Sequence, residues 1–99
     1  MRTTTVERSR RIAELLNQNT EKPKAYNLED LFGLLPKTNK VTWVFGYGGY
    51  NLKEDKDLEE YYVDIDFERD GETVSKTFFN ESMFDVVFEA VCWWLEQKK

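Results

Sequence analysis

The stretch YYVDIDFERDGETVSKTFFN, residues 61–80, decides the fold of this chain. Apolar and polar residues alternate over residues 59–69, which is the period of two that is typical of a half-buried β-strand. Asp70-Gly71 is a two-residue turn of the type preferred in tight hairpins, and apolar residues return behind it. These features predict an antiparallel hairpin. Its expected register pairs Arg69 with Glu72, Phe67 with Val74, Ile65 with Lys76 and Val63 with Phe78.

Lys76 conflicts with the apolar face that the rest of this register predicts. An unpaired buried ammonium group is costly. We therefore expect the strand that contains Lys76 at an edge of the sheet, where its aliphatic stem packs and its ammonium group reaches water.

A further strand is predicted upstream of the hairpin. Val41, Trp43, Phe45 and Tyr47 fall on one face of residues 41–47, which gives this strand one large aromatic face. Two glycines then end or bend the strand, and the charged stretch of residues 50–58 reads as a polar connection to the hairpin.

The last segment predicts a helix that begins after a cap at Asn80 or Ser82. Two apolar rows cover most of its circumference. Such a helix needs cover on two sides, either from the sheet and two N-terminal helices or from the sheet and a second subunit. A homodimer through this C-terminal helix is the expected assembly. The residues left for water form a strip of Asp85, Glu89, Cys92 and Glu96.

Two shorter helices are predicted before the sheet. The first runs from Thr4 to about Gln18, and Asn27 caps the second, which Pro36 ends. The expected fold class is therefore α+β, with a three-stranded antiparallel sheet packed against a C-terminal helix and two N-terminal helices. We expect a single domain over residues 1–99. We expect a helix within residues 1–20 that can be semi-independent of the core in residues 27–99.

The residue composition excludes several classes of active site. The chain contains no His and a single Cys, Cys92. Catalytic triads, His-based metal sites and intramolecular disulfides are therefore ruled out. Cys92 lies in an acidic strip, which raises a thiol pKa, so we expect a structural thiol. Because no pattern places an acid, a base and an electrophile together, we expect a non-enzymatic protein with no catalytic residues, no metal site and no cofactor.

Charge is unevenly distributed along the chain, whose formal net charge is -5. Residues 1–40 carry eight Lys/Arg and five Asp/Glu, whereas residues 41–99 carry six and fourteen. An acidic body disfavours direct binding to nucleic acid. No segment is apolar enough to span a membrane and the start lacks a signal-peptide pattern, so we expect a cytoplasmic protein with no membrane partner.

Aromatic residues are the first candidates for binding a protein partner. Tyr47 and Tyr50 flank a glycine pair, where exposed rings often anchor a partner. Trp93 and Trp94 are neighbours on a helix and point about 100° apart, so Trp93 is a candidate for an interface. These residues support a first hypothesis, a non-enzymatic protein-binding accessory protein whose partner the sequence does not identify.

Carboxylates are the second group of candidates. Asp64, Asp66 and Glu68 share one strand face at a spacing of roughly 6.6 Å. This flat spacing is poor for chelating a cation, but it resembles the charge spacing of a nucleic-acid backbone. It supports the alternative hypothesis of an acidic nucleic-acid mimic that inhibits a DNA- or RNA-binding protein.

The order of several segments resembles small uncharacterised proteins of bacterial phages and prophages. These segments are NLEDL, LLPK, the aromatic strands and SMFDVVFEAVCWWLE, and the resemblance covers residues 27–98. It implies a bacterial cytoplasm and the binding of host or phage machinery. It transfers no active site to this chain.

Overall fold

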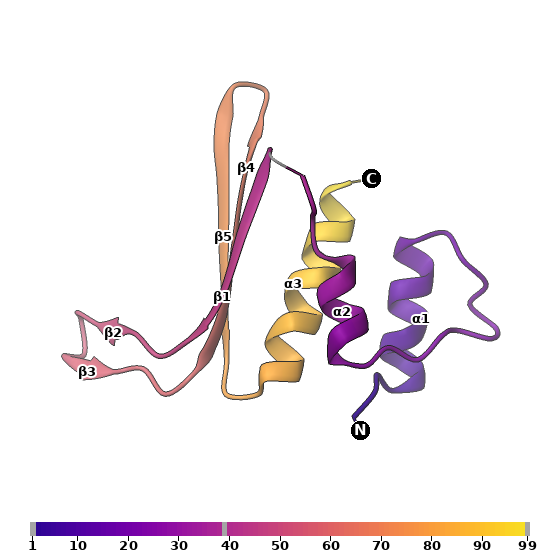
Figure 1. Ribbon diagram of the computed structural model, residues 1–99, viewed down its shortest axis with the longest axis horizontal. Coiled ribbons are helices and arrows are strands. Elements are labelled where there is room, and N and C mark those ends of the chain that lie inside the picture. The colour runs from indigo at the N-terminus through magenta and orange to yellow at the C-terminus, as the bar shows by residue number, and fades with distance from the viewer. Residues whose placement is uncertain (1, 39, 99) are drawn as a thin grey trace.

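The fold consists of three layers. The computed structural model describes residues 2–38 and 40–98. A β-sheet forms the first layer, α3 (Met83–Gln97) and α2 (Leu28–Leu34) form the second, and α1 (Val6–Leu15) lies on the far side of α3 from the sheet (Figure 1). This arrangement confirms the predicted α+β class. The elements in chain order are α1 (Val6–Leu15), α2 (Leu28–Leu34), β1 (Val41–Tyr47), β2 (Tyr50–Asn51), β3 (Lys56–Asp57), β4 (Tyr61–Arg69), β5 (Glu72–Asn80) and α3 (Met83–Gln97).

The main sheet is antiparallel with the order β1-β4-β5. The register of β4 with β5 agrees with all four predicted pairs. Asp70 and Gly71 have φ angles of 54° and 83°, which places both turn residues in the left-handed region that such hairpins require. β5 is an edge strand, and Lys76 is exposed there with its Nζ 5.7 Å from the centre of the Phe78 ring. The predicted edge position of Lys76 is therefore confirmed.

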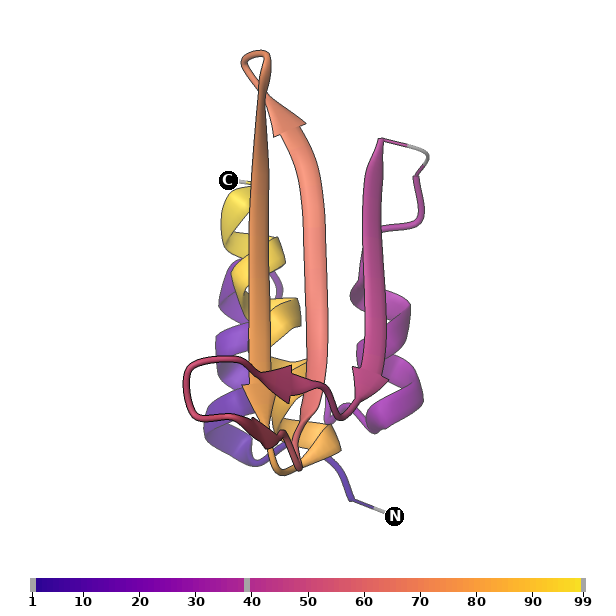
Figure 2. The same ribbon diagram turned by 90° about the vertical axis from the view of Figure 1, so that its left-hand side faces the viewer.

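A two-stranded ribbon of β2 and β3 leaves the main sheet between β1 and β4. The sequence predicted only a polar connection here. The ribbon forms because the Asn51 side-chain carbonyl accepts hydrogen bonds from the backbone N–H groups of Lys53 and Glu54, at 3.0 and 3.2 Å, and closes the turn. Figure 2 shows the ribbon in front of the sheet face that is turned away from the helices.

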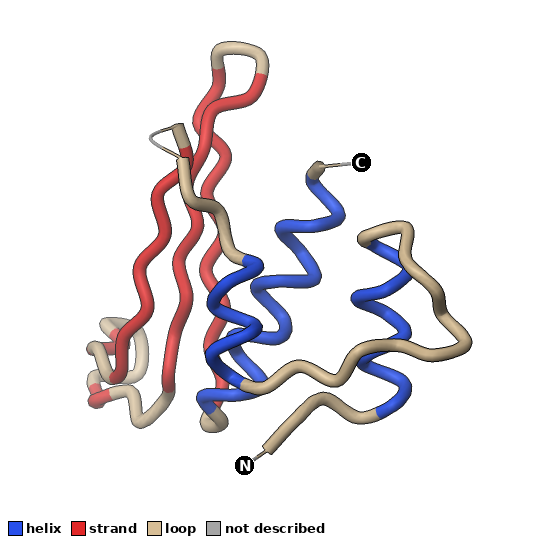
Figure 3. Tube along the Cα trace, turned by 45° about the vertical axis from the view of Figure 1, so that its right-hand side comes forward, coloured by secondary structure: helices blue, strands red, loops and turns tan. Residues whose placement is uncertain are grey.

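The hydrophobic core lies between the sheet and the helices. Figure 3 shows the three helices on one side of the strands. Val63 and Ile65 of β4 are fully buried against this helical layer, as are Val87 and Val91 of α3. Burying each of these side chains stabilises the fold by roughly 1.5–3 kcal/mol. On the opposite face of β4, no helix formed by residues 2–38 or 40–98 packs against the sheet, and the ribbon stands in front of one end (Figure 2).

Local signals set the helix ends. Thr5 caps α1, and Asn27 caps α2 as predicted, with Asp30 completing a capping box. Ser82 caps α3. The predicted end of the first helix at Gln18 is wrong by three residues. Asn17 adopts a φ of 57°. Its N–H donates to the carbonyl of Glu14 and the N–H of Gln18 donates to the carbonyl of Ala13, so α1 ends in a Schellman motif.

The polar strip of α3 faces α1. Arg8 Nη1 lies 2.6 Å from Asp85 Oδ1, and Arg11 forms an ion pair with Glu96. Cys92 is 8% exposed between them. The expectation that the whole strip faces water is therefore wrong for Asp85 and Cys92, because arginines of α1 neutralise the carboxylates. The cover of α3 comes from the sheet and the two N-terminal helices, and the homodimer remains a prediction.

Candidate partner-binding surface

Apolar side chains gather at the end of the sheet from which the ribbon emerges. Leu52 is 86% exposed, and Tyr47, Tyr50 and Phe79 are 61%, 51% and 47% exposed. Leu58 is half-buried beside them. We call these five residues the end patch. An exposed apolar group of this kind usually marks an interaction site.

Two glycines between β1 and β2 set the direction in which the ribbon leaves the sheet. Gly48 and Gly49 have φ angles of 92° and 134°, which residues other than glycine rarely adopt. The Gly48 N–H donates to the Glu60 carbonyl, and the Leu58 N–H donates to the Gly49 carbonyl, both at 2.9 Å. These bonds fix the root of the ribbon to the chain that enters β4.

Four residues of the end patch, Tyr47, Tyr50, Leu58 and Phe79, line a shallow hollow on the uncovered side of the sheet. Its volume is about 410 Å³, and a neighbouring hollow of about 480 Å³ shares Tyr50, Leu58 and Phe79 with it. The floor includes Tyr62, whose ring lies over Gly46: a Cβ at Gly46 would stand 2.6 Å from that ring. Glycine at this position therefore makes room for the aromatic floor. The lining residues of the first hollow are Tyr47, Gly48, Gly49, Tyr50, Leu58, Tyr62, Asp64, Thr77 and Phe79.

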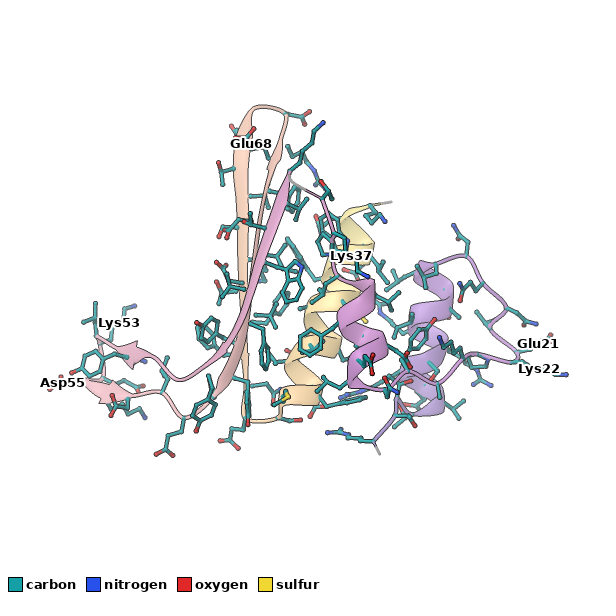
Figure 4. The ribbon with its side chains drawn as sticks, in the orientation of Figure 1. Glu21, Lys22, Lys37, Lys53, Asp55 and Glu68 are labelled. Carbon is teal, nitrogen blue, oxygen red and sulfur yellow. The ribbon has the colours of Figure 1, made fainter. Side chains whose placement is uncertain are left out.

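An acidic row continues from this hollow along β4. The row consists of Asp64, Asp66 and Glu68, which lie on the uncovered face as the alternation predicted. The Thr77 hydroxyl donates to Asp64 Oδ1 at 2.9 Å, and the Ser75 hydroxyl donates to Asp66 Oδ1. Glu68 is exposed near the hairpin end of the row (Figure 4). Cross-strand hydroxyls thus orient the two aspartates.

Trp93 lies apart from the other candidates. Its ring is half-buried on the covered face, with its centre 5.9 Å from that of Phe67 and 6.0 Å from that of Phe78. The structure therefore brings Tyr47, Tyr50 and Asp64 to one hollow and places Trp93 between the sheet and α3.

Several residues of the surface were missed by the sequence reasoning. Leu52 and Leu58 interrupt a charged segment, and Phe79 follows Thr73, Ser75 and Thr77 on the otherwise polar outward face of β5. Each is an apolar residue at a position where water is expected, and this signal could have identified all three.

The chemical groups near α1 and on the surface offer little reactivity. Burial is the main cause that raises the pKa of the Cys92 thiol to about 11, although the nearby Arg11 guanidinium acts in the opposite direction. Among residues 2–38 and 40–98, no three His, Cys, Asp or Glu side chains are grouped closely enough to hold a metal ion. Within the same residues, no helix has the length and apolar character needed to cross a membrane.

Comparison of the chain with protein-family models, with curated proteins and with solved structures gave no match.

Proposed function

We propose that this protein is a non-enzymatic accessory protein of a phage or mobile genetic element and that it binds a protein partner through the end patch. The observation that carries the proposal is the exposure of Leu52, Tyr50 and Phe79 around one hollow. Keeping three such side chains in water costs free energy that burial at an interface would recover. Tyrosines are also enriched at the centres of protein interfaces.

The lining of the adjoining hollow, which shares Tyr50, Leu58 and Phe79 with the first, supports binding more than catalysis. It offers aromatic rings, backbone groups and the carboxylate of Asp64, which already accepts a hydrogen bond from Thr77. Such groups can orient and desolvate an inserted side chain. The resemblance to phage proteins favours a partner from the bacterial cytoplasm. A homodimer through α3 has less support, because the sheet, α1 and α2 already cover this helix.

Capture from a bacterial lysate tests the proposal. The lysate is treated with nuclease, and proteins retained by the native chain are compared with those retained by a Tyr50→Ser/Leu52→Ser variant. Val6→Ser is the matched control, because Val6 is 61% exposed on α1, at the opposite side of the molecule. We expect a partner that the native chain and the control retain and the double variant loses. A set of captured proteins that is identical for all three chains would refute the end patch as a binding surface.

The acidic row supports a second candidate function, a nucleic-acid mimic that occupies a basic groove. Its three carboxylates repeat at roughly 6.6 Å along an uncovered strand. Exposed charges are strongly screened by salt, so binding by a mimic should be lost at high salt and should not require Tyr50 or Leu52. Binding through the end patch should instead be lost in the Tyr50→Ser/Leu52→Ser variant. Asp64→Asn/Asp66→Asn/Glu68→Gln should abolish capture by a mimic. Capture that survives this triple change would eliminate the mimic.

A further inference from the structure

The end patch and the acidic row form one continuous surface. Asp64 lines the hollow and is also the first carboxylate of the row. Tyr62 precedes it on the same face of β4 and supplies the floor of the hollow. An apolar site and a line of negative charge therefore meet at Asp64.

We infer that this surface takes an extended basic segment of the partner protein, with one apolar side chain in the hollow and Lys or Arg side chains over the row. The inference rests on the proposed function and specifies the chemistry of its partner. It concerns the same end patch and adds the charge that the partner must carry.

The charge of the row is not compensated by the ion pairs seen in the described part of the chain. Those pairs use Asp85, Glu96 and Glu54, which lie elsewhere. Lys40 lines a hollow with Asp66 and Glu68, in the half of the row toward the hairpin turn. The row carries three negative charges beside this one positive charge, so a cationic partner segment would meet net negative charge there.

The strands beside the row leave it accessible. On β1 the neighbours across from Asp64 and Asp66 are Val44 and Thr42, and on β5 they are Thr77 and Ser75. These side chains are short, and none carries a charge. Asp64 and Asp66 consequently lie along the middle strand of the sheet, half-buried between short uncharged side chains of the two neighbouring strands.

Spacing specifies the segment. Same-face residues on a strand repeat at roughly 6.6 Å, and the side chains of an extended peptide repeat at the same distance. An apolar residue opposite Tyr62 is thus followed by basic residues two, four and six positions along, opposite Asp64, Asp66 and Glu68. A segment with this alternation matches all three carboxylates at once.

Synthetic peptides test the spacing. The probe is Trp-Ser-Lys-Thr-Lys-Thr-Lys, and its control, Trp-Lys-Lys-Lys-Ser-Thr-Thr, has the same composition and net charge. Titration calorimetry with the native protein measures both affinities. We expect the alternating peptide to bind about fivefold or more tightly than the control, because electrostatic complementarity depends on position. Equal affinities, or no binding of the alternating peptide, would overturn the inference.

Protein variants test the site. The triple variant Asp64→Asn/Asp66→Asn/Glu68→Gln should bind the alternating peptide about tenfold or more weakly than the native protein, because three charges that oppose the lysines are removed. The matched control is Glu7→Gln/Glu21→Gln/Glu29→Gln, which removes the same charge from exposed residues on the helical side. We expect the affinity of this control variant for the alternating peptide to stay within about twofold of the native value, because the three removed charges lie beyond a Debye length from the row. Equal losses in both variants would reduce the effect to net charge and contradict a specific site.

The two proposals fail in distinguishable ways. If Tyr50→Ser/Leu52→Ser loses a captured partner while the peptides do not bind, the end patch remains a binding surface and the basic segment is wrong. If the double variant retains every captured protein, the proposed function itself is wrong.

Discussion

Arg8 Nη1 of α1 donates a hydrogen bond of 2.6 Å to Asp85 Oδ1 of α3, across 77 positions of the sequence. Arg2 reaches the same oxygen at 3.0 Å, and the Arg8 guanidinium lies 4.6 Å from the centre of the Phe88 ring. The outer layer of the fold is therefore held on α3 by charge as well as by the buried side chain of Ile12. This contact covers Asp85 and Cys92 of the strip, whereas Glu89 and Glu96 stay exposed.

Asp85→Asn should destabilise the protein by about 1–3 kcal/mol, because two arginines lose their charged acceptor. Urea unfolding followed by circular dichroism gives the free energy. Glu89→Gln is the control, since Glu89 is exposed on the same helix. Its effect should stay within about 0.5 kcal/mol. Similar losses in the two variants would mean that the Asp85 contact contributes little.

The stability that Asp85 provides should depend on pH. Burial raises the pKa of Asp85, but the hydrogen bond and charge of Arg8, together with the charge of Arg2, outweigh it and hold the folded-state pKa below the ordinary value of 3.8. The unfolded chain therefore binds this proton more readily than the folded one. The contribution is present above the ordinary pKa and is lost as pH falls through the folded-state pKa.

Unfolding free energies at a series of pH values check this sign. The difference between the native protein and Asp85→Asn should be constant near neutral pH and shrink on acidification below about pH 4. A difference that grows on acidification would show that Asp85 is not stabilised as a carboxylate.

Cys92 should react slowly with thiol reagents in the folded protein. The thiol is 8% exposed and its pKa is raised to about 11, chiefly by burial, so little thiolate is present near neutral pH. We expect the reaction to require opening of α1, and Asp85→Asn to accelerate it. Modification of the native protein at the rate of the urea-unfolded chain would show that α1 does not protect this thiol.

Gly71→Ala and Gly33→Ala should change the stability of the protein in opposite directions. Gly71 has a φ of 83° in the hairpin turn, so Gly71→Ala should destabilise the protein by about 1 kcal/mol. A Cβ on Gly33 of α2 would meet nothing within 4 Å, and Gly33→Ala should stabilise by roughly 0.5–1 kcal/mol. Thermal unfolding of both variants provides the comparison. A stabilising Gly71→Ala would contradict the left-handed turn.

The hairpin and the caps could be predicted because their causes are local. Asp70 and Gly71 set the turn, and the period of two then fixes which side chains share a face. Asp64, Asp66 and Glu68 were placed on one face for this reason, and the structure agrees. The ribbon was missed because its pairing of Tyr50 with Asp57 depends on the Asn51 turn and the tethering bonds at its root, which charge patterning does not reveal.

The sequence by itself determined the α+β class, the register of β4 with β5 and the acidic face of β4, since alternation and turn geometry act between near neighbours. Only the tertiary structure decided that Tyr47, Tyr50, Leu58 and Phe79 surround one hollow, that Trp93 lies on the other face, and that α1 covers Asp85 and Cys92. A polar strip on a helix has the same pattern whether water or a basic helix faces it. Distant arginines satisfy the carboxylates as well as solvent does, so the pattern alone does not distinguish the two.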